Sequence, residues 1–155
     1  MLTTFLILLI IIAAVVLYFT RMIIAPALST EAELALEQLV REAHADPAFG
    51  DLPKQQIFED SIYGYKLHGL YIPRHGAQRT VVLCHDIHQN LYSLRQLAVF
   101  FNQQRYNVLL WDLRRHGLSG GWTISYGYYE KHDLQVMVDW AVDQLGPQGI
   151  VGTYG

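Results

Sequence analysis

Hydrophobic and polar residues are unevenly distributed along the chain, and the first segment stands apart from the rest. No charged residue occurs between positions 2 and 19, and Arg21 follows soon after this run. An uninterrupted apolar run of about 20 residues is long enough to cross the hydrocarbon layer of a bilayer as a helix. We therefore predict one transmembrane anchor within residues 1–25, which contacts the lipid bilayer through residues 2–24.

A cleaved signal peptide is the alternative interpretation of this segment. Signal peptides have an apolar region of about 7 to 15 residues and a positively charged start. The present run is longer and no basic residue precedes it, although Ala25-Pro26-Ala27 faintly resembles a cleavage site. We expect an uncleaved single-pass anchor in the cell membrane. Its orientation stays open, because Arg21 alone provides a flanking charge.

The pattern after the anchor predicts an acidic helix followed by an α/β domain. Acidic residues outnumber basic ones between Pro26 and Asp60, and leucines at helical spacing predict a helix from Thr30 to His44 with a loop after it. Alternating segments from Gln56 onward predict an antiparallel strand pair. Continuous apolar runs then predict buried strands with helices between them. The predicted strands are 80–84, 106–111 and the segment from Ile150, and the predicted helices are 91–104 and 128–145.

This order of elements predicts the fold class and the domain boundaries. A hairpin followed by β-α-β-α-β places helices on both faces of a largely parallel sheet. We assign 55–155 to this α/β domain, 26–54 to the acidic helix and linker, and 1–25 to the anchor. The formal net charge of −3, without a basic stripe, argues against nucleic-acid binding.

Polar residues gather directly after the first two buried strands, where ligands bind in open parallel sheets. His85 to Asn90 follow the first of these strands, and Asp112 to Gly121 follow the second. The single cysteine, Cys84, excludes an intrachain disulfide. A metal cluster of Cys84 with His85 and His88 is not expected, since successive strand residues face opposite sides and no four-ligand spacing is present. We therefore predict no metal and no cofactor.

Three segments resemble the α/β-hydrolase family, in particular membrane-anchored bacterial serine hydrolases similar to serine aminopeptidases and monoacylglycerol lipases. They are residues 67–73, the strand that ends at His85, and above all residues 106–121. Within the last, D-L-R-R-H-G-L-S-G-G is similar to the family's D-x-R-G-H-G-x-S-x-G. The resemblance covers about residues 57–155. It implies acyl transfer to a serine on a G-x-S-x-G turn, with the acid and the histidine later in the chain.

The resemblance aligns Gly155 with the first glycine of that turn, so the serine, acid and base are expected beyond it. The resemblance implies that this chain supplies one hydrogen-bond donor to the developing oxyanion, the backbone N–H of Ile87. Four side chains are expected to brace loops rather than to catalyse; they are His85, Asp112, Arg114 and His116. We predict the N-terminal half of a membrane-anchored hydrolase for ester, thioester or peptide bonds, inactive as given.

Ser119 also lies in a literal G-x-S-x-G match. That motif needs a strand before the serine and a helix after it. Ser119 follows Trp111 at a distance and precedes a loop-like stretch, Trp122 to Gly127. We interpret Ser119 as a turn residue.

Two residues depart from the family pattern. Asp86 replaces the glycine after the histidine, and Arg115 replaces the glycine before His116. A carboxylate beside the oxyanion donor would repel developing negative charge unless it points away. An arginine at positive φ costs roughly 1 kcal/mol. Both motivate the alternative hypothesis of a non-catalytic membrane protein, or of a split half that needs a separately encoded C-terminal half in trans.

Overall fold

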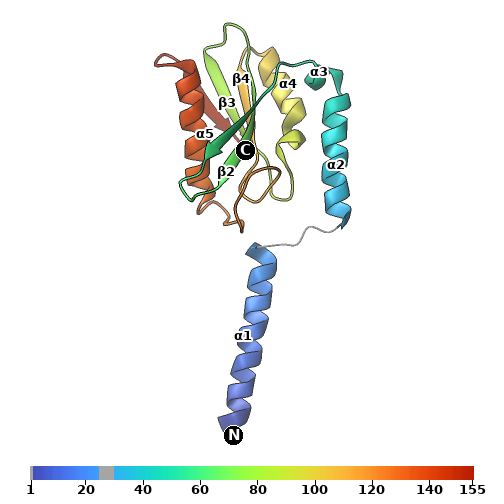
Figure 1. Ribbon diagram of the computed structural model, residues 1–155, viewed down its shortest axis with the longest axis vertical. Coiled ribbons are helices and arrows are strands. Elements are labelled where there is room, and N and C mark those ends of the chain that lie inside the picture. Colours follow the sequence, from blue (N-terminus) through green and yellow to red (C-terminus); the bar gives the residue numbers. More distant parts are fainter. Residues whose placement is uncertain (1, 25–29) are drawn as a thin grey trace.

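The computed structural model describes residues 2–24 and 30–155, which form a long N-terminal helix and a sheet flanked by further helices (Figure 1). The predicted α/β class is confirmed. In chain order the elements are α1 (Leu2–Ile24), α2 (Thr30–Ala45), α3 (Pro47–Gly50), β1 (Gln55–Asp60), β2 (Lys66–Ile72), β3 (Arg79–Cys84), η1 (Leu91–Leu94), α4 (Arg95–Gln103), β4 (Asn107–Trp111), α5 (Glu130–Leu145) and β5 (Ile150–Tyr154).

Helix α1 projects away from the domain and none of its residues is buried. It is 23 residues long and its mean hydropathy reaches 2.9 over an 18-residue window, so it is long and apolar enough to cross a membrane, a test that an N-terminal signal sequence also passes. At the rise of an α-helix it is about 35 Å long. Its last turn meets the domain, because the carbonyl of Ile24 accepts a 3.0 Å hydrogen bond from the N–H of Ile124.

The sheet has five strands in the order β1-β2-β4-β3-β5. Strand β2 pairs antiparallel with both β1 and β4, whereas β3 pairs parallel with β4 and with β5. The predicted hairpin and the predicted parallel strands are therefore confirmed. The chain passes from β3 through α4 to β4, and then through α5 to β5 on the other side of β3, so the two helices cover opposite faces (Figure 1).

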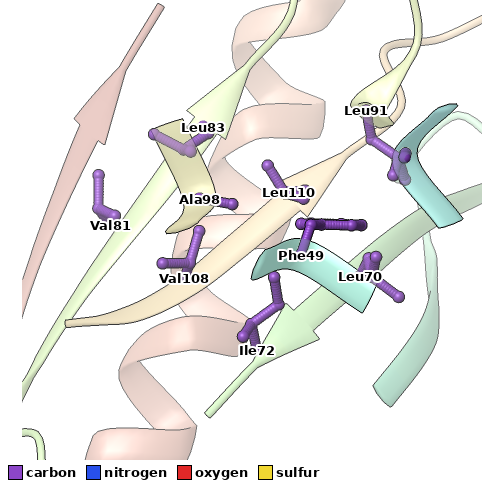
Figure 2. Close-up of a cluster of buried hydrophobic side chains, with 10 residues drawn as sticks. Phe49, Leu70, Ile72, Val81, Leu83, Leu91, Ala98, Val108 and Leu110 are labelled. Carbon is purple, nitrogen blue, oxygen red and sulfur yellow. The ribbon is translucent and has the colours of Figure 1, made fainter. Parts of the chain in front are cut away.

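Each face of the sheet carries its own hydrophobic core. Phe49, Leu83 and Leu110 belong to the cluster on the α3 and α4 face, which Figure 2 shows. Trp111 and Met137 belong to the cluster beneath α5. Neighbouring strand residues alternate between the two clusters because successive side chains in a strand point to opposite faces. This double burial explains why the parallel strands read as continuous apolar runs.

Two predicted boundaries were wrong. Residues 47–50, expected as loop, form the one-turn helix α3, because the Asp46 carboxylate accepts the N–H of Ala48 at 3.0 Å and Pro47 occupies the first helical position.

Helix α5 begins at Glu130 rather than at residue 128. The residues before it turn sharply, with φ of +51° at Tyr126 and +96° at Gly127, and positive φ does not continue into a helix.

Candidate functional site

The carboxyl ends of β3 and β4 lie side by side, and the loops that follow them leave toward opposite faces of the sheet. Cys84 and Trp111, the last residues of the two strands, are register partners. A crevice at such a position is where ligands bind in open α/β sheets. A cavity of about 670 Å³ opens here, and its lining includes His68, His88, His116, Leu118 and Ile124.

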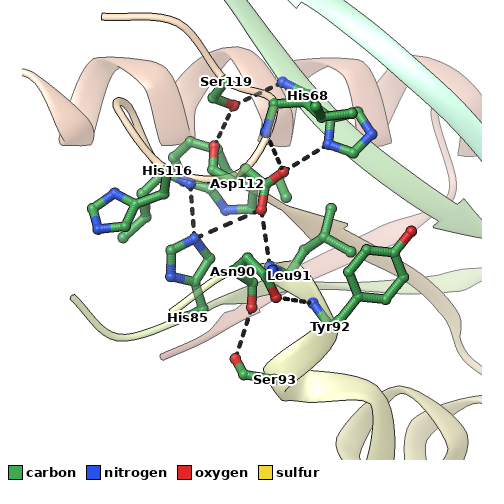
Figure 3. Close-up of polar contacts among 12 residues, drawn as sticks. His68, His85, Asn90, Leu91, Tyr92, Ser93, Asp112, His116 and Ser119 are labelled. Carbon is green, nitrogen blue, oxygen red and sulfur yellow. Dashed lines mark hydrogen bonds and ion pairs between the residues drawn. The ribbon is translucent and has the colours of Figure 1, made fainter. Parts of the chain in front are cut away.

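Asp112 holds three separate segments together at this edge (Figure 3). Its Oδ1 accepts the N–H of Leu91 at 2.9 Å, and its Oδ2 accepts the N–H of Leu118 at 3.1 Å. Nδ1 of His68 donates to Oδ2 at 2.7 Å, and both side chains are only 3% exposed. These donors offset the cost of burying the carboxylate. Asp112 thereby connects β2, the loop after β3 and the loop after β4.

The tight approach of the second loop to Asp112 requires glycine at position 117. Gly117 has φ of +49°, and a Cβ built on it would overlap the carboxylate of Asp112. The predicted motif residue therefore has a steric reason to be glycine.

His85 connects the two loops through both of its ring nitrogens. Nδ1–H donates to the carbonyl of Asp86 at 2.7 Å, and Nε2 accepts the N–H of Leu113 at 3.1 Å. Burial lowers the pKa of His85, against the opposing effect of its hydrogen bond to Asp86 and of Asp112 nearby. The ring is therefore neutral, with its proton on Nδ1.

His116 makes the matching connection on the other side. Its Nδ1–H donates to the carbonyl of Arg114 at 2.9 Å, and its Nε2 accepts the N–H of His88 at 3.2 Å. The rings of His85 and His116 meet edge to face with centroids 5.2 Å apart. Because the backbone engages both nitrogens of each ring, neither histidine has a nitrogen free to take a proton from a substrate.

Arg114 is placed differently from the hydrogen-bonded role expected for it. Its guanidinium lies 4.5 Å from the ring centre of Tyr129 and 5.3 Å from that of Tyr65, in cation–π contact. Among the described residues, its Nε and Nη1 have no hydrogen-bond partner. Arg114 therefore packs between aromatic rings and does not extend the network around Asp112.

A second buried carboxylate, Asp133, was not predicted as a site residue. It accepts hydrogen bonds of 2.5 Å from the hydroxyls of Ser61 and Tyr65. Burial, together with the hydrogen bond to Asp133, raises the pKa of Tyr65 to about 12. The sequence carries little indication of this cluster, because Ser61 and Tyr65 flank a turn far from α5. His68 was missed as well, although a histidine at an inward strand position is a usable indication.

The expected oxyanion donor, the N–H of Ile87, is already engaged in this structure. It donates to Oδ1 of Asp86 at 2.7 Å. The carboxylate that replaces the family's glycine therefore does not point away from the donor. It occupies the position that the resemblance assigns to a developing oxyanion, whose charge it would oppose.

Two further expectations concern the loop after β4. Arg115 has φ of +61°, which confirms that its position requires a left-handed backbone. The hydroxyl of Ser119 donates to the carbonyl of Asp112 at 2.6 Å and accepts the N–H of His68 at 2.8 Å. No helix follows Ser119 directly, and its hydroxyl is buried and fully used, as expected for a loop serine.

The carboxyl end of β5 lies beside that of β3. A Cβ built on Gly155 would be 3.0 Å from Cβ of Cys84, immediately before the loop that carries Ile87. Burial raises the pKa of the Cys84 thiol, and Nε1 of Trp111 lies 3.3 Å from its sulfur. A protonated, packed thiol is a poor nucleophile.

Among the residues whose side chains the structure describes, no three His, Cys, Asp or Glu residues are grouped so as to hold a metal ion.

Solved structures share this fold over about two thirds of the chain. The Pyrococcus furiosus esterase Pf2001 matches 69% of this chain and 43% of its own chain, with 28% identity and a TM-score of 0.62. XC6422 from Xanthomonas campestris, an α/β serine hydrolase without a lid, matches 64% of this chain and 49% of its own, with 19% identity and a TM-score of 0.53. This chain carries the N-terminal half of an α/β-hydrolase fold.

A curated relative matches nearly the whole chain. The uncharacterized protein YqkD of Bacillus subtilis (strain 168) is 30% identical over 142 residues, which are 92% of this chain and 47% of that protein. The chain thus spans about half the length of this relative. No family model matches the chain.

Proposed function

We propose that the chain is the N-terminal portion of a membrane-anchored serine hydrolase that acts on ester, thioester or peptide bonds. The hydrolase part of the proposal is supported by the fold and by the likeness to a protein named an esterase. The anchor is proposed from α1, which is apolar, has no buried residue and is as long as a membrane span requires.

The observation that carries the proposal is the meeting of the β3 and β5 carboxyl ends. Gly155 lies against Cys84, and Ile87 follows Cys84 by only a few residues. In a G-x-S-x-G hydrolase the nucleophile comes on the turn after such a strand, and one oxyanion donor comes from the loop after the neighbouring strand. A serine shortly after β5 would therefore lie within reach of the N–H of Ile87.

A chimera tests this proposal. Residues 1–155 would be joined in register to the part of YqkD that follows its matched region. We expect the chimera to hydrolyse p-nitrophenyl esters and to react with a fluorophosphonate probe, because acyl transfer needs both halves of the site. Replacing the supplied serine of G-x-S-x-G by alanine is the control. A folded chimera that neither turns over esters nor reacts with the probe would refute the proposal.

Residues 1–155 alone are expected to give no fluorophosphonate labelling. Ser119 is the serine of the literal G-x-S-x-G match in this chain, and its hydroxyl is buried and donates to a backbone carbonyl. Labelling of this chain that disappears in Ser119→Ala would assign the nucleophile to Ser119 instead.

A non-catalytic role is the second candidate, and the hydrogen bond from Ile87 to the Asp86 carboxylate favours it. The same chimera separates the two. If Asp86 silences the site, Asp86→Gly should raise ester turnover by about 100-fold, the size of effect that one oxyanion donor has. Asp86→Asn is the matched control, because it removes the charge and keeps an acceptor. Equal turnover in all three chimeras would discard the idea that Asp86 blocks the donor.

A further inference from the structure

The loop between β4 and α5 exposes a set of large apolar side chains. We call this set the aromatic patch; its members are Leu118, Trp122, Tyr126 and Tyr128. Trp122 is 88% exposed, and each of the other three members has more than half of its surface exposed. A tryptophan offers roughly 150–250 Å² of surface for burial, so leaving it in water forgoes a large favourable contribution.

The aromatic patch does not result from a loose loop. The guanidinium of Arg115 donates to the carbonyl of Trp122. Ile124, two residues later, is 5% exposed, and the carboxylate of Glu130 accepts the N–H groups of Ser125 and Gly127 at 2.7 and 2.8 Å. The backbone of the loop is thus held on both sides of the exposed rings.

The same loop is joined to the end of the proposed membrane anchor. The N–H of Ile124 donates to the carbonyl of Ile24 at 3.0 Å, and the hydroxyl of Tyr126 donates to the carbonyl of Ile23 at 3.2 Å. Figure 1 shows the loops after β3 and β4 on the side of the domain that faces α1. Two residues of extended chain span at most about 7 Å, so Trp122 lies within that distance of the residue that touches α1.

The position of Ile24 along α1 sets the depth of the loop. The uncharged run of α1 ends just before Arg21, and a helix of about 35 Å exceeds the hydrocarbon layer of about 30 Å. The last turn of α1 therefore falls in the headgroup region. Tryptophan and tyrosine side chains favour this region, because their rings are apolar and carry a polar tip.

We infer that the aromatic patch rests in the headgroup region of the bilayer that α1 spans, so that the candidate site at the carboxyl ends of β3 and β4 faces the membrane. The occupant of this surface is lipid. The inference rests on the proposed anchor, and it gives the proposed hydrolase a substrate class, namely amphipathic acyl esters presented at the membrane surface. The cavity supports this, because Leu118 of the patch and Ile124 beside α1 both line it.

Tryptophan fluorescence tests the inference, because all three tryptophans lie outside α1. The full chain would be placed in nanodiscs of phosphatidylcholine, with one copy per disc. Matched discs would contain phosphatidylcholine with acyl chains brominated near the headgroup, which quenches nearby indoles. Trp111 is fully buried in the core, and Trp140 packs on Tyr71 in the cluster beneath α5. We expect brominated lipid to remove the share of emission that belongs to Trp122.

Two variants complete the experiment. Trp122→Phe should abolish the quenching without affecting folding, since the ring is exposed, and Trp140→Phe should retain it. If the chain copurifies with the discs but is quenched no more than Trp122→Phe, this inference is overturned and the proposed anchor is retained. Failure to copurify with the discs would overturn the anchor, and this inference with it. Neither result would bear on ester hydrolysis by the chimera.

Discussion

Two buried aspartates stabilise different parts of this domain, and their partners differ in kind. Asp112 accepts two backbone N–H groups and an imidazole. Asp133 accepts two side-chain hydroxyls. Backbone donors cannot turn away when the acceptor is lost, whereas hydroxyls rotate freely to other acceptors. Asp112 therefore stabilises the loops of the candidate site, whereas Asp133 attaches the β1–β2 hairpin to α5.

Replacement of Asp112 should have the largest effect. Asp112→Ala leaves the N–H of Leu91, which is fully buried, and the buried ring of His68 without acceptors. Each buried donor left without its acceptor costs about 1–3 kcal/mol, so these two donors together cost about 2–6 kcal/mol. We expect a loss of this size in the free energy of unfolding, measured by urea denaturation of the full chain in micelles with tryptophan emission as the probe. Asp112→Asn, which keeps an acceptor oxygen, should lose less; equal losses would contradict the account.

Replacement of Asp133 should cost less. Asp133→Ala leaves two hydroxyls without their acceptor, that of buried Ser61 and that of half-buried Tyr65. Unsatisfied polar groups cost about 1–3 kcal/mol when water is excluded, and we expect a loss near the lower end of this range by the same denaturation. Tyr65→Phe is the matched control and should lose part of that amount. A loss for Asp133→Ala larger than for Asp112→Ala would reverse the comparison.

The same contrast explains how far the sequence could predict the molecule. The continuous apolar runs predict the parallel strands and their succession along the chain, since burial on both faces favours apolar side chains at successive positions. Asp112 was recognisable because it follows a buried strand directly. Asp133 lies in the middle of α5, and nothing local pairs it with a turn far back in the chain. The hydrogen bond between Ile87 and Asp86 depends on a side-chain rotamer, which no pattern of residue types determines.

The pH dependence of His85 sharpens the description of the Asp112 region. Burial lowers the pKa of His85 below its usual 6.5, so the folded state favours the neutral ring. The unfolded chain takes up this proton first as the pH falls. The contribution of His85 to stability is therefore complete above pH 6.5 and is lost as the pH falls below that value. Denaturation at a series of pH values should show this loss in the original chain and not in His85→Gln; identical profiles would contradict it.

The smallest expected effect belongs to the Asp133 region and appears at high pH. The pKa of Tyr65 is raised from 10.0 to about 12, because burial and the hydrogen bond to Asp133 favour the neutral phenol. Between these values the unfolded chain releases the proton while the folded chain retains it, so this contribution is complete below pH 10.0 and disappears as the pH approaches about 12. Tyr63, Tyr71 and Tyr92 also have raised pKa values, but they are shared with the variant Tyr65→Phe and cancel in the difference. The stabilities of the original chain and of Tyr65→Phe should therefore converge across this interval, and a constant gap between them would show that the phenol proton of Tyr65 is not held by Asp133.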